Sequence, residues 1–152
     1  AKYMGLSMAQ IAEGIAKLQP VEHRLQLIPG PVTVIDDAFN SNPEGARAAM
    51  EVLRSFDGRR IVITPGMVEL GEEEESQNEE FGREIACSAD FAILVGKKRA
   101  IPIRRGILSL EFPPENIFVV SNLEQATQVL AHLSVPGDVV LFENDLPDNY
   151  NE

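Results

Sequence analysis

The chain lacks several features that would each point to a particular class of protein. Its 152 residues contain one cysteine and two histidines, which excludes an internal disulfide and gives little support to a metal site. No apolar run approaches the roughly 20 residues that a membrane-spanning helix needs, and no signal-peptide pattern opens the sequence. The expectation is a cytoplasmic protein that does not span a membrane.

Basic residues are also few, with 13 Lys and Arg against 24 Asp and Glu and a formal net charge of -11. This balance argues against general nucleic-acid binding but leaves room for a small nucleotide site, which needs only a few donors. Acids gather at residues 72–75, 79 and 80, a pattern typical of the exposed face and first turn of a helix. The 44% of hydrophobic residues are enough for one globular domain with a core.

Three motifs of common enzyme sites are missing. The chain has no Gly-x-Gly-x-x-Gly, no Gly-x-x-x-x-Gly-Lys-Ser/Thr and no Gly-x-Ser-x-Gly, so it contains neither a dinucleotide fingerprint, nor a P-loop, nor a hydrolase nucleophile elbow. His23 and His132 lack the spacing of metal ligands, and His132 is expected at the surface or at a helix cap. Cys87 has apolar surroundings on a predicted helix, which places it in the core.

What the chain does have is a regular alternation of apolar strands and amphipathic helices. Strands are predicted over residues 25–28, 32–35, 60–64, 91–95, 117–120 and 139–142, and helices over residues 7–18, 44–56, 72–89, 99–110 and 123–133. The turn at residues 29–31 fits either a hairpin or a bend between sheets, and Pro102 is expected to delay or kink its helix. The pattern predicts a single α/β domain with a Rossmann-like, mostly parallel sheet covered by helices on both faces.

Right-handed crossovers place the loops that follow the strands of such a sheet on one rim, where ligands bind. The rim is expected to gather Asp36, Asp37, Asn40, Asn42, Met67, Glu69, Lys97, Lys98, Ser121, Glu143, Asn144 and Asp145. One of the two acids at 36 and 37 could instead serve only to cap the helix that begins near Pro43.

Four segments resemble motifs of the Mur ligase family, in the family's order. Residues 36–43 (Asp-Asp-Ala-Phe-Asn-Ser-Asn-Pro) resemble its Asp-Asp-x-Tyr-Asn-Ala-Asn-Pro loop, and residues 66–71 (Gly-Met-Val-Glu-Leu-Gly) its Gly-Asp-Met-x-Glu-Leu-Gly loop. Residues 23–26 (His-Arg-Leu-Gln) resemble the segment between the central ATPase domain and the C-terminal domain, and residues 1–18 the last helix of the central domain. Together they cover essentially the whole chain.

The resemblance implies that residues 25–152 are the C-terminal domain of a three-domain, ATP-dependent ligase of peptidoglycan precursor synthesis. Residues 1–24 would be the end of the central domain and the linker. In this family ATP and Mg²⁺ are bound mainly by the central domain. The carboxylate of a UDP-N-acetylmuramoyl-peptide is phosphorylated and then attacked by the amine of an amino acid or dipeptide. The C-terminal domain closes over this site, so the chain by itself is expected to be inactive.

By position, the resemblance implies that Arg24 and Asp37 contact the ribose of ATP and that Asn40 lies next to the phosphates. Asn42 would support the loop or touch the ligand. Substrate contacts are expected from Met67, Glu69, Glu143, Asn144 and Asp145. No catalytic residue and no metal ligand is expected within these 152 residues.

Within the family, the loops are most similar to those of the ligases that add D-alanyl-D-alanine, which makes this dipeptide the expected acceptor. Those ligases commonly have Asp at Gly66, His at Asn78, and Lys-Gly-Ser-Arg where residues 143–146 read Glu-Asn-Asp-Leu. An acidic end would bind a different group, such as a substrate amine, so another amino compound stays open as the acceptor. The alternative function is a non-catalytic nucleotide-binding or interaction domain of the same fold.

Overall fold

Strands and helices alternate along residues 24–38 and 42–144, the part of the chain that the computed structural model describes. The strands are β1 (Gln26–Ile28), β2 (Thr33–Asp37), β3 (Arg60–Thr64), β4 (Phe91–Val95), β5 (Ile117–Val120) and β6 (Val139–Glu143). The helices are α2 (Pro43–Arg54), α3 (Glu74–Ser88), α4 (Lys97–Leu108) and α5 (Leu123–Leu133), with short 3-10 helices η2 (Gly71–Glu73) and η3 (Pro114–Asn116).

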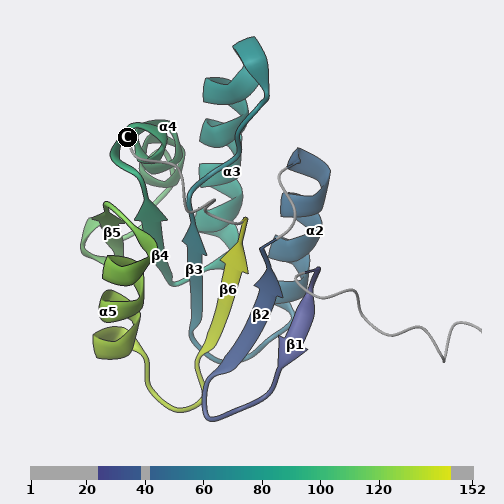
Figure 1. Cartoon of the computed structure of the whole chain (residues 1–152), viewed down its shortest axis with the longest axis vertical. Coiled ribbons are helices and arrows are strands. Elements are labelled where there is room, and N and C mark those ends of the chain that lie inside the picture. Colours follow the sequence, from purple (N-terminus) through teal and green to yellow (C-terminus); the bar gives the residue numbers. More distant parts are fainter. Residues whose placement is uncertain (1–23, 39–41, 145–152) are drawn as a thin grey trace, which may run out of the picture.

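The six strands form one sheet in the order β1-β2-β6-β3-β4-β5. β1 pairs antiparallel with β2, and every other neighbouring pair is parallel, so the carboxyl ends of β2 to β6 lie together at the top of Figure 1. The predicted mostly parallel sheet is confirmed. Of the two arrangements that the turn at residues 29–31 allowed, the hairpin is the correct one.

Helices cover both faces of the sheet, as predicted. α2, α3 and α4 lie behind the sheet in Figure 1 and α5 lies in front of it. The core behind the sheet joins strand residues such as Ile35 and Leu141 to Met50 and Ile103 on the helices. The core in front joins Ile63, Ile93 and Val140 to α5. β3 and β4 are buried on both faces, which explains why they read as unbroken apolar runs.

α3 and α4 pack closely because a glycine on each helix lies in the contact. A Cβ atom on Gly82 would overlap the carbonyl oxygen of Ile103, and one on Gly106 would overlap the carbonyl oxygen of Glu79. The two backbones therefore approach to a distance that no larger residue allows. This packing fixes the N-terminal ends of both helices at the rim of the sheet.

Two sequence-based expectations about these helices are wrong. α4 begins at Lys97 and not near residue 99, and it continues through Pro102. The proline removes only one intrahelical hydrogen bond, and the helix is held by buried neighbours such as Ile103. Cys87 is exposed and not in the core, because α3 turns Ile85 and Ser88 toward the sheet and leaves position 87 on its outer face.

The end of the sheet opposite the rim is closed by an ion pair. Asp138 is only 2% exposed, and it accepts hydrogen bonds from Arg59 Nε and Nη2 at 2.9 and 2.7 Å. Its Oδ2 also accepts the backbone N–H of Val135 at 2.9 Å. Because these donors stabilise the carboxylate, with the Arg59 hydrogen bond as the largest cause, the pKa of Asp138 is lowered from its ordinary value.

Candidate functional site

The rim at the carboxyl ends of the parallel strands gathers the polar residues that the sequence placed there. Of the predicted set, Asp36, Asp37, Asn42, Met67, Glu69, Lys97, Lys98, Ser121, Glu143 and Asn144 lie in the described residues and follow or end a strand at this edge. Asn40 and Asp145 lie outside the described residues. The rim is the candidate site because ligands of open α/β sheets bind at this edge.

The start of the domain is fastened to the end of β2. The backbone N–H of Leu25 donates to Asp37 Oδ1 at 3.0 Å, and Asp37 is 1% exposed. Leu25 has a φ of 48°, a left-handed conformation that is costly for this residue type. The hydrogen bond places the exposed Arg24 beside the β2 exit. The structure thus brings together the two residues for which the resemblance implies a shared ribose contact.

The loop after β2 uses its polar side chains to fix its own backbone. Asp36 Oδ1 accepts the N–H of Ala38 at 3.1 Å. Asn42 is the N-cap of α2, with an extended backbone and an Oδ1 that accepts the N–H of Gly45 at 2.8 Å. The hypothesis that one of the two acids caps this helix is therefore wrong, because both acids belong to β2 and only Asn42 directly precedes the first turn.

The loop after β3 is held by Asn78, a residue that the sequence marked only as a departure from the family. Its Oδ1 accepts the N–H of Met67 at 2.8 Å, and its Nδ2 donates to the carbonyls of Met67 and Glu74 at 2.9 Å each. Asn78 is fully buried. Gly66 beside it has a φ of 82°, and a Cβ there would lie 2.7 Å from Asn78 Oδ1. A side-chain amide that bonds both groups of one residue orders this loop.

The exit of β6 joins the other two loops. Asn144 has a φ of 69°, its backbone N–H donates to the carbonyl of Asp37 at 3.3 Å, and its Nδ2 donates to the carbonyl of Gly66 at 2.7 Å. The loops after β2, β3 and β6 are thereby tied into one unit. Nothing in the sequence signals these bonds, because their partners are 78 or more residues apart.

Glu143, the last residue of β6, is the most unusual group of the rim. It is fully buried and lies directly opposite Asp37 in the strand pairing, and no donor from the described part of the chain reaches its two carboxyl oxygens. The pKa of Glu143 is raised to about 10, with burial as the largest cause and with the charge of Asp37 and a hydrogen bond with Asp37 as further causes.

Burial separates the predicted substrate residues into two groups. Met67, Glu143 and Asn144 are buried, whereas Glu69 is exposed, with a φ of 63°. The buried residues hold the rim together in this structure, and their contacts to a substrate stay a prediction. Glu69 alone among these four presents its side chain to the solvent.

A polar hollow of about 550 Å³ lies at the rim between the N-terminal ends of α3 and α4, and we call it the α3–α4 hollow. It is lined by Gly71, Glu72, Glu74, Glu75, Asn78, Lys98, Arg99, Ile101 and Pro102. Acidic residues form the wall that belongs to η2 and α3, and basic residues form the wall that belongs to α4. Such a hollow suits a ligand that carries a positive and a negative group.

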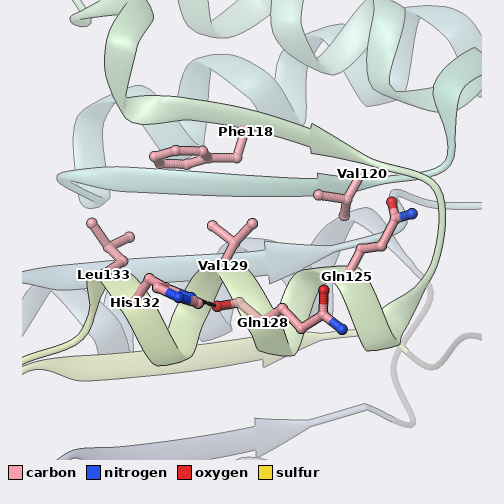
Figure 2. A pocket seen from close by; sticks show the side chains of 7 residues that line it. All are labelled: Phe118, Val120, Gln125, Gln128, Val129, His132 and Leu133. Carbon is pink, nitrogen blue, oxygen red and sulfur yellow. Dashed lines mark hydrogen bonds between the residues drawn. The ribbon is translucent and has the colours of Figure 1, made fainter.

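A second hollow, of about 650 Å³, runs along α5 and the edge strand β5. Figure 2 shows the side chains of Phe118, Val129 and Leu133 between the strand and the helix. His132 is exposed, as predicted, and its Nδ1 lies 2.7 Å from the carbonyl oxygen of Gln128 in the preceding turn. Its lining contains no acid, nucleophile or cation besides this histidine, so the hollow offers no arrangement for catalysis.

Residues 24–38 and 42–144 contain no group of three or more His, Cys, Asp or Glu side chains that could hold a metal ion. The helices of this part of the chain are all too short or too polar to cross a membrane.

Comparison with known proteins decides the family. The family model described as "Mur ligase, glutamate ligase domain" matches residues 23–143, which is most of the chain. The chain belongs to this family. The resemblance to this family is thereby confirmed, and the rim described above is the rim of a Mur ligase C-terminal domain. The motif at residues 1–18, with the helix predicted over residues 7–18, lies outside the described residues.

Curated relatives of this Mur ligase domain carry more than one activity in their names. The UDP-N-acetylmuramoyl-tripeptide--D-alanyl-D-alanine ligase of Bacillus subtilis is 26% identical over 145 residues, which cover 93% of this chain and 32% of that protein. The enzyme of the same name from Mycobacterium leprae is 31% identical over 160 residues, 91% of this chain and 31% of that protein. A UDP-N-acetylmuramoylalanine--D-glutamate ligase of Pelotomaculum thermopropionicum is 28% identical over 144 residues, 93% of this chain and 29% of that protein. The chain thus spans about a third of the length of these relatives.

Solved structures agree on the fold. The MurF ligase of Thermotoga maritima in complex with ADP superposes with a TM-score of 0.77 at 25% identity, over 95% of this chain and 32% of that one. The MurC ligase of the same organism superposes with a TM-score of 0.73 at 18% identity, over 96% of this chain and 32% of that one, which shows the fold alone. The single α/β domain with a mostly parallel sheet is therefore that of Mur ligase C-terminal domains.

Proposed function

We propose that this chain is the C-terminal domain of a longer ATP-dependent ligase that joins an amino compound to a UDP-N-acetylmuramoyl-peptide in peptidoglycan precursor synthesis. The carrying observation is the rim, where three loops are bonded into one unit beside the N-terminal entry of the domain. The family match and the printed names of the relatives support the same class of reaction. Residues 1–24 would join this domain to a central domain that supplies the P-loop and most of the Mg²⁺ ligands.

The reaction proceeds in two steps. The γ-phosphoryl group of ATP is transferred to the carboxylate of the peptide, which gives an acyl phosphate and ADP. The neutral amine of the acceptor then attacks the acyl carbon, phosphate leaves, the amine nitrogen loses a proton, and an amide forms. This chain contributes orientation of the reactants and exclusion of water, which would otherwise hydrolyse the acyl phosphate.

The nucleotide end of the site would be formed by Arg24, Asp37 and Asn40. Asp37 Oδ1 accepts the N–H of Leu25. The Asp37 carboxylate can also accept ribose hydroxyls when the central domain presents its bound ATP to the end of β2. Arg24 is exposed next to it and offers a planar set of donors. Asn42 supports this end by capping α2.

The acceptor end would lie in the α3–α4 hollow. Glu72 and Glu74 on one wall suit the ammonium group of an amino acid or dipeptide, and Lys98 on the other suits its carboxylate, whereas Glu75 is paired with Arg105 at 2.9 Å. Glu69 projects from the adjoining loop. D-Alanyl-D-alanine has both groups, as do other amino acids, so the hollow supports a zwitterionic acceptor and D-alanyl-D-alanine as the first candidate.

The test is an assay of the longer ligase with ATP, Mg²⁺, UDP-N-acetylmuramoyl-tripeptide and a panel of acceptors. Release of phosphate and a product mass that is increased by the acceptor minus water are expected with D-alanyl-D-alanine or with another zwitterionic amine. If no acceptor is converted and calorimetry detects tight ATP binding to the 152-residue chain alone, a non-catalytic nucleotide-binding domain would be favoured instead.

A matched pair of variants tests the acceptor end. Lys98→Glu reverses a charge that lines the α3–α4 hollow and should raise the KM for the acceptor at least about tenfold with little change in the KM for ATP. Lys97→Glu makes the same change at an exposed neighbour that does not line the hollow, and it should leave both KM values near those of the wild type. Equal effects of the two variants would remove the hollow from the proposal.

A further inference from the structure

Two acids end neighbouring strands on the same face of the sheet. Asp37 of β2 and Glu143 of β6 are register partners, and they follow Ile35 and Leu141, which face the core under α2 and α3. Asp37 is 1% exposed and Glu143 is 0% exposed. Two ionised carboxylates in such a position repel each other and have lost their hydration, so the ionisation of both is unfavourable.

Within residues 24–38 and 42–144, the elements packed around Glu143 bring no cation that acts on it. On α2, Arg47 and Arg54 point to Glu84 of α3, at 3.7 and 3.9 Å. On β3, the last residue is the uncharged Thr64. Asn144 directs its side chain to the carbonyl of Gly66.

The remaining charged groups nearby are Arg24, which is exposed and adjoins Leu25 at the β2 exit, and three acids. Glu44 on α2 and Glu69 in the loop after β3 are both exposed, and Asp36 lies on the opposite face of the sheet from Asp37. The one titratable group that acts on Glu143 is Asp37. No described residue therefore balances a negative charge on Glu143, and a proton is the group that can neutralise it.

We propose that Glu143 is a positioning residue that stays protonated at neutral pH and donates its carboxyl hydrogen to Asp37. The donated hydrogen bond orients the Asp37 carboxylate, whose Oδ1 holds the N–H of Leu25 next to Arg24. Glu143 is thus the support for the residue that fixes the entry of the linker into the domain.

The electrostatics of the pair agree with this assignment. Burial, as the largest cause, and Asp37, by its charge and its hydrogen bond, together raise the pKa of Glu143 to about 10. A raised value means that the folded chain keeps a proton which the unfolded chain releases. Stability from this group is therefore complete below the ordinary Glu pKa and is lost as the pH rises toward about 10.

The consequence for nucleotide binding rests on the proposed function. If Asp37 accepts the ribose hydroxyls, the proton on Glu143 keeps the pair at a single negative charge beside the polyphosphate of ATP.

The protonation state can be tested on the 152-residue chain without any ligase activity. Infrared spectra at about pH 7 should contain the C=O stretch of a protonated carboxyl group, which is lost in Glu143→Gln and retained in Glu111→Gln, the same change at an exposed acid. From about pH 6 to pH 9, the unfolding equilibrium constant should rise with pH more steeply in the wild type than in Glu143→Gln, by up to about tenfold per pH unit. Equal pH slopes, or a spectrum with carboxylate bands alone, would overturn the proposal.

If Glu143→Gln fails to fold, the pH titration of the protonated band in the wild type still decides. The band must persist above neutral pH. Its disappearance near the ordinary pKa of a Glu side chain would contradict the proposal. The positioning role has its own readout in the longer ligase. Glu143→Ala should raise the KM for ATP, and Glu143→Gln, whose amide also donates to Asp37, should restore it.

The two parts can fail separately. A protonated band with an unchanged KM for ATP in Glu143→Ala would leave the shared proton in place and remove the positioning role. A ligase that proves inactive with every acceptor would refute the proposed function while the infrared result stands.

Discussion

The two ends of the sheet treat a buried acid in opposite ways. At the end where the parallel strands begin, Asp138 is paired with Arg59 and accepts a backbone N–H, and its pKa is lowered. At the rim, Glu143 faces the acid Asp37, has no donor, and its pKa is raised to about 10. Both carboxyl groups are almost completely buried. The difference lies in the partner that the fold supplies.

The comparison separates an end that is closed by contacts within the domain from the end where we propose that ligands bind. Arg59 also donates to the carbonyl of Leu133 and stacks over the ring of Phe91 at 5.1 Å, so the lower end is closed by contacts within the domain. The rim instead contains left-handed residues at Leu25 and Asn144 and an acid pair. Proteins place such costly features at functional sites and offset them elsewhere.

The largest expected effect comes from breaking the closed end. Asp138→Ala removes both Arg59 bonds and the acceptor for Val135, and it should lower the free energy of unfolding by about 2 kcal/mol, because Arg59 is partly exposed and can be rehydrated. Chemical denaturation measures this change. Asp57→Ala, at an exposed acid in the preceding turn, should stay within about 0.5 kcal/mol. Equal effects would mean that the ion pair does not stabilise this end.

The pH dependence should differ between the two ends. The contribution of Asp138 is present above the ordinary Asp pKa and is lost as the pH falls through its lowered value, whereas that of Glu143 is lost as the pH rises. Asp138→Ala should flatten the acid limb of the stability curve and Glu143→Gln the alkaline limb. The acid loss should be smaller than that of Asp138→Ala at neutral pH, since a protonated carboxyl still accepts from Val135. Thermal unfolding across pH measures both limbs, and changes on the same limb would contradict the assignment.

At the rim, Gly66→Ala should lower the free energy of unfolding by about 1.5 kcal/mol. Gly66 has a φ of 82°, and a Cβ would lie 2.7 and 2.8 Å from Asn78 Oδ1 and Ile103 Cδ1. Gly71→Ala is the control, because Gly71 also has a positive φ, of 59°, but no atom within 4 Å of the added Cβ. Its cost should be the smaller of the two in the same denaturation experiment. The reverse order would show that contact with Asn78 does not fix this loop.

The smallest effect is expected from the helix caps. Asn42→Ala and Asn122→Ala each remove a side-chain oxygen that accepts an N–H, from Gly45 at 2.8 Å and from Gln125 at 2.9 Å, and each should cost about 1 kcal/mol. Kinetics of the longer ligase should separate them, with a higher KM for ATP in Asn42→Ala alone. An equal change in Asn122→Ala would assign the effect to stability and not to the rim.

Much of the fold could be predicted because it depends on local pattern. The apolar runs at residues 60–64 and 91–95 coincide with β3 and β4, and the amphipathic spacing after Pro43 gives α2 with Ala46, Ala49 and Met50 buried. The predictions that Cys87 lies in the core and that α4 begins near residue 99 were wrong for one reason. The exact rotation and onset of a helix depend on what packs against it, here β-sheet residues and the close contact of α3 with α4.

The candidate site could be predicted in its location but not in its contacts. Strand ends and the resemblance placed Asp37, Asn42 and Glu143 at one rim, and the structure describes all three there. The clasp of Asn78 on Met67 and the bond from Asn144 to Gly66 join residues that are 11 and 78 positions apart. A sequence carries no local signal for such pairs.

The sequence by itself determined the α/β class, the family and the edge of the sheet where the polar residues gather, because strand periodicity and short motifs are properties of neighbouring residues. Only the tertiary structure decided which acids are buried and what faces them. It gave Asp138 an arginine and Glu143 a second acid. The reason is the strand order β2-β6-β3, which places the last strand between two strands from the first half of the chain. The charge state of a buried acid follows from that arrangement.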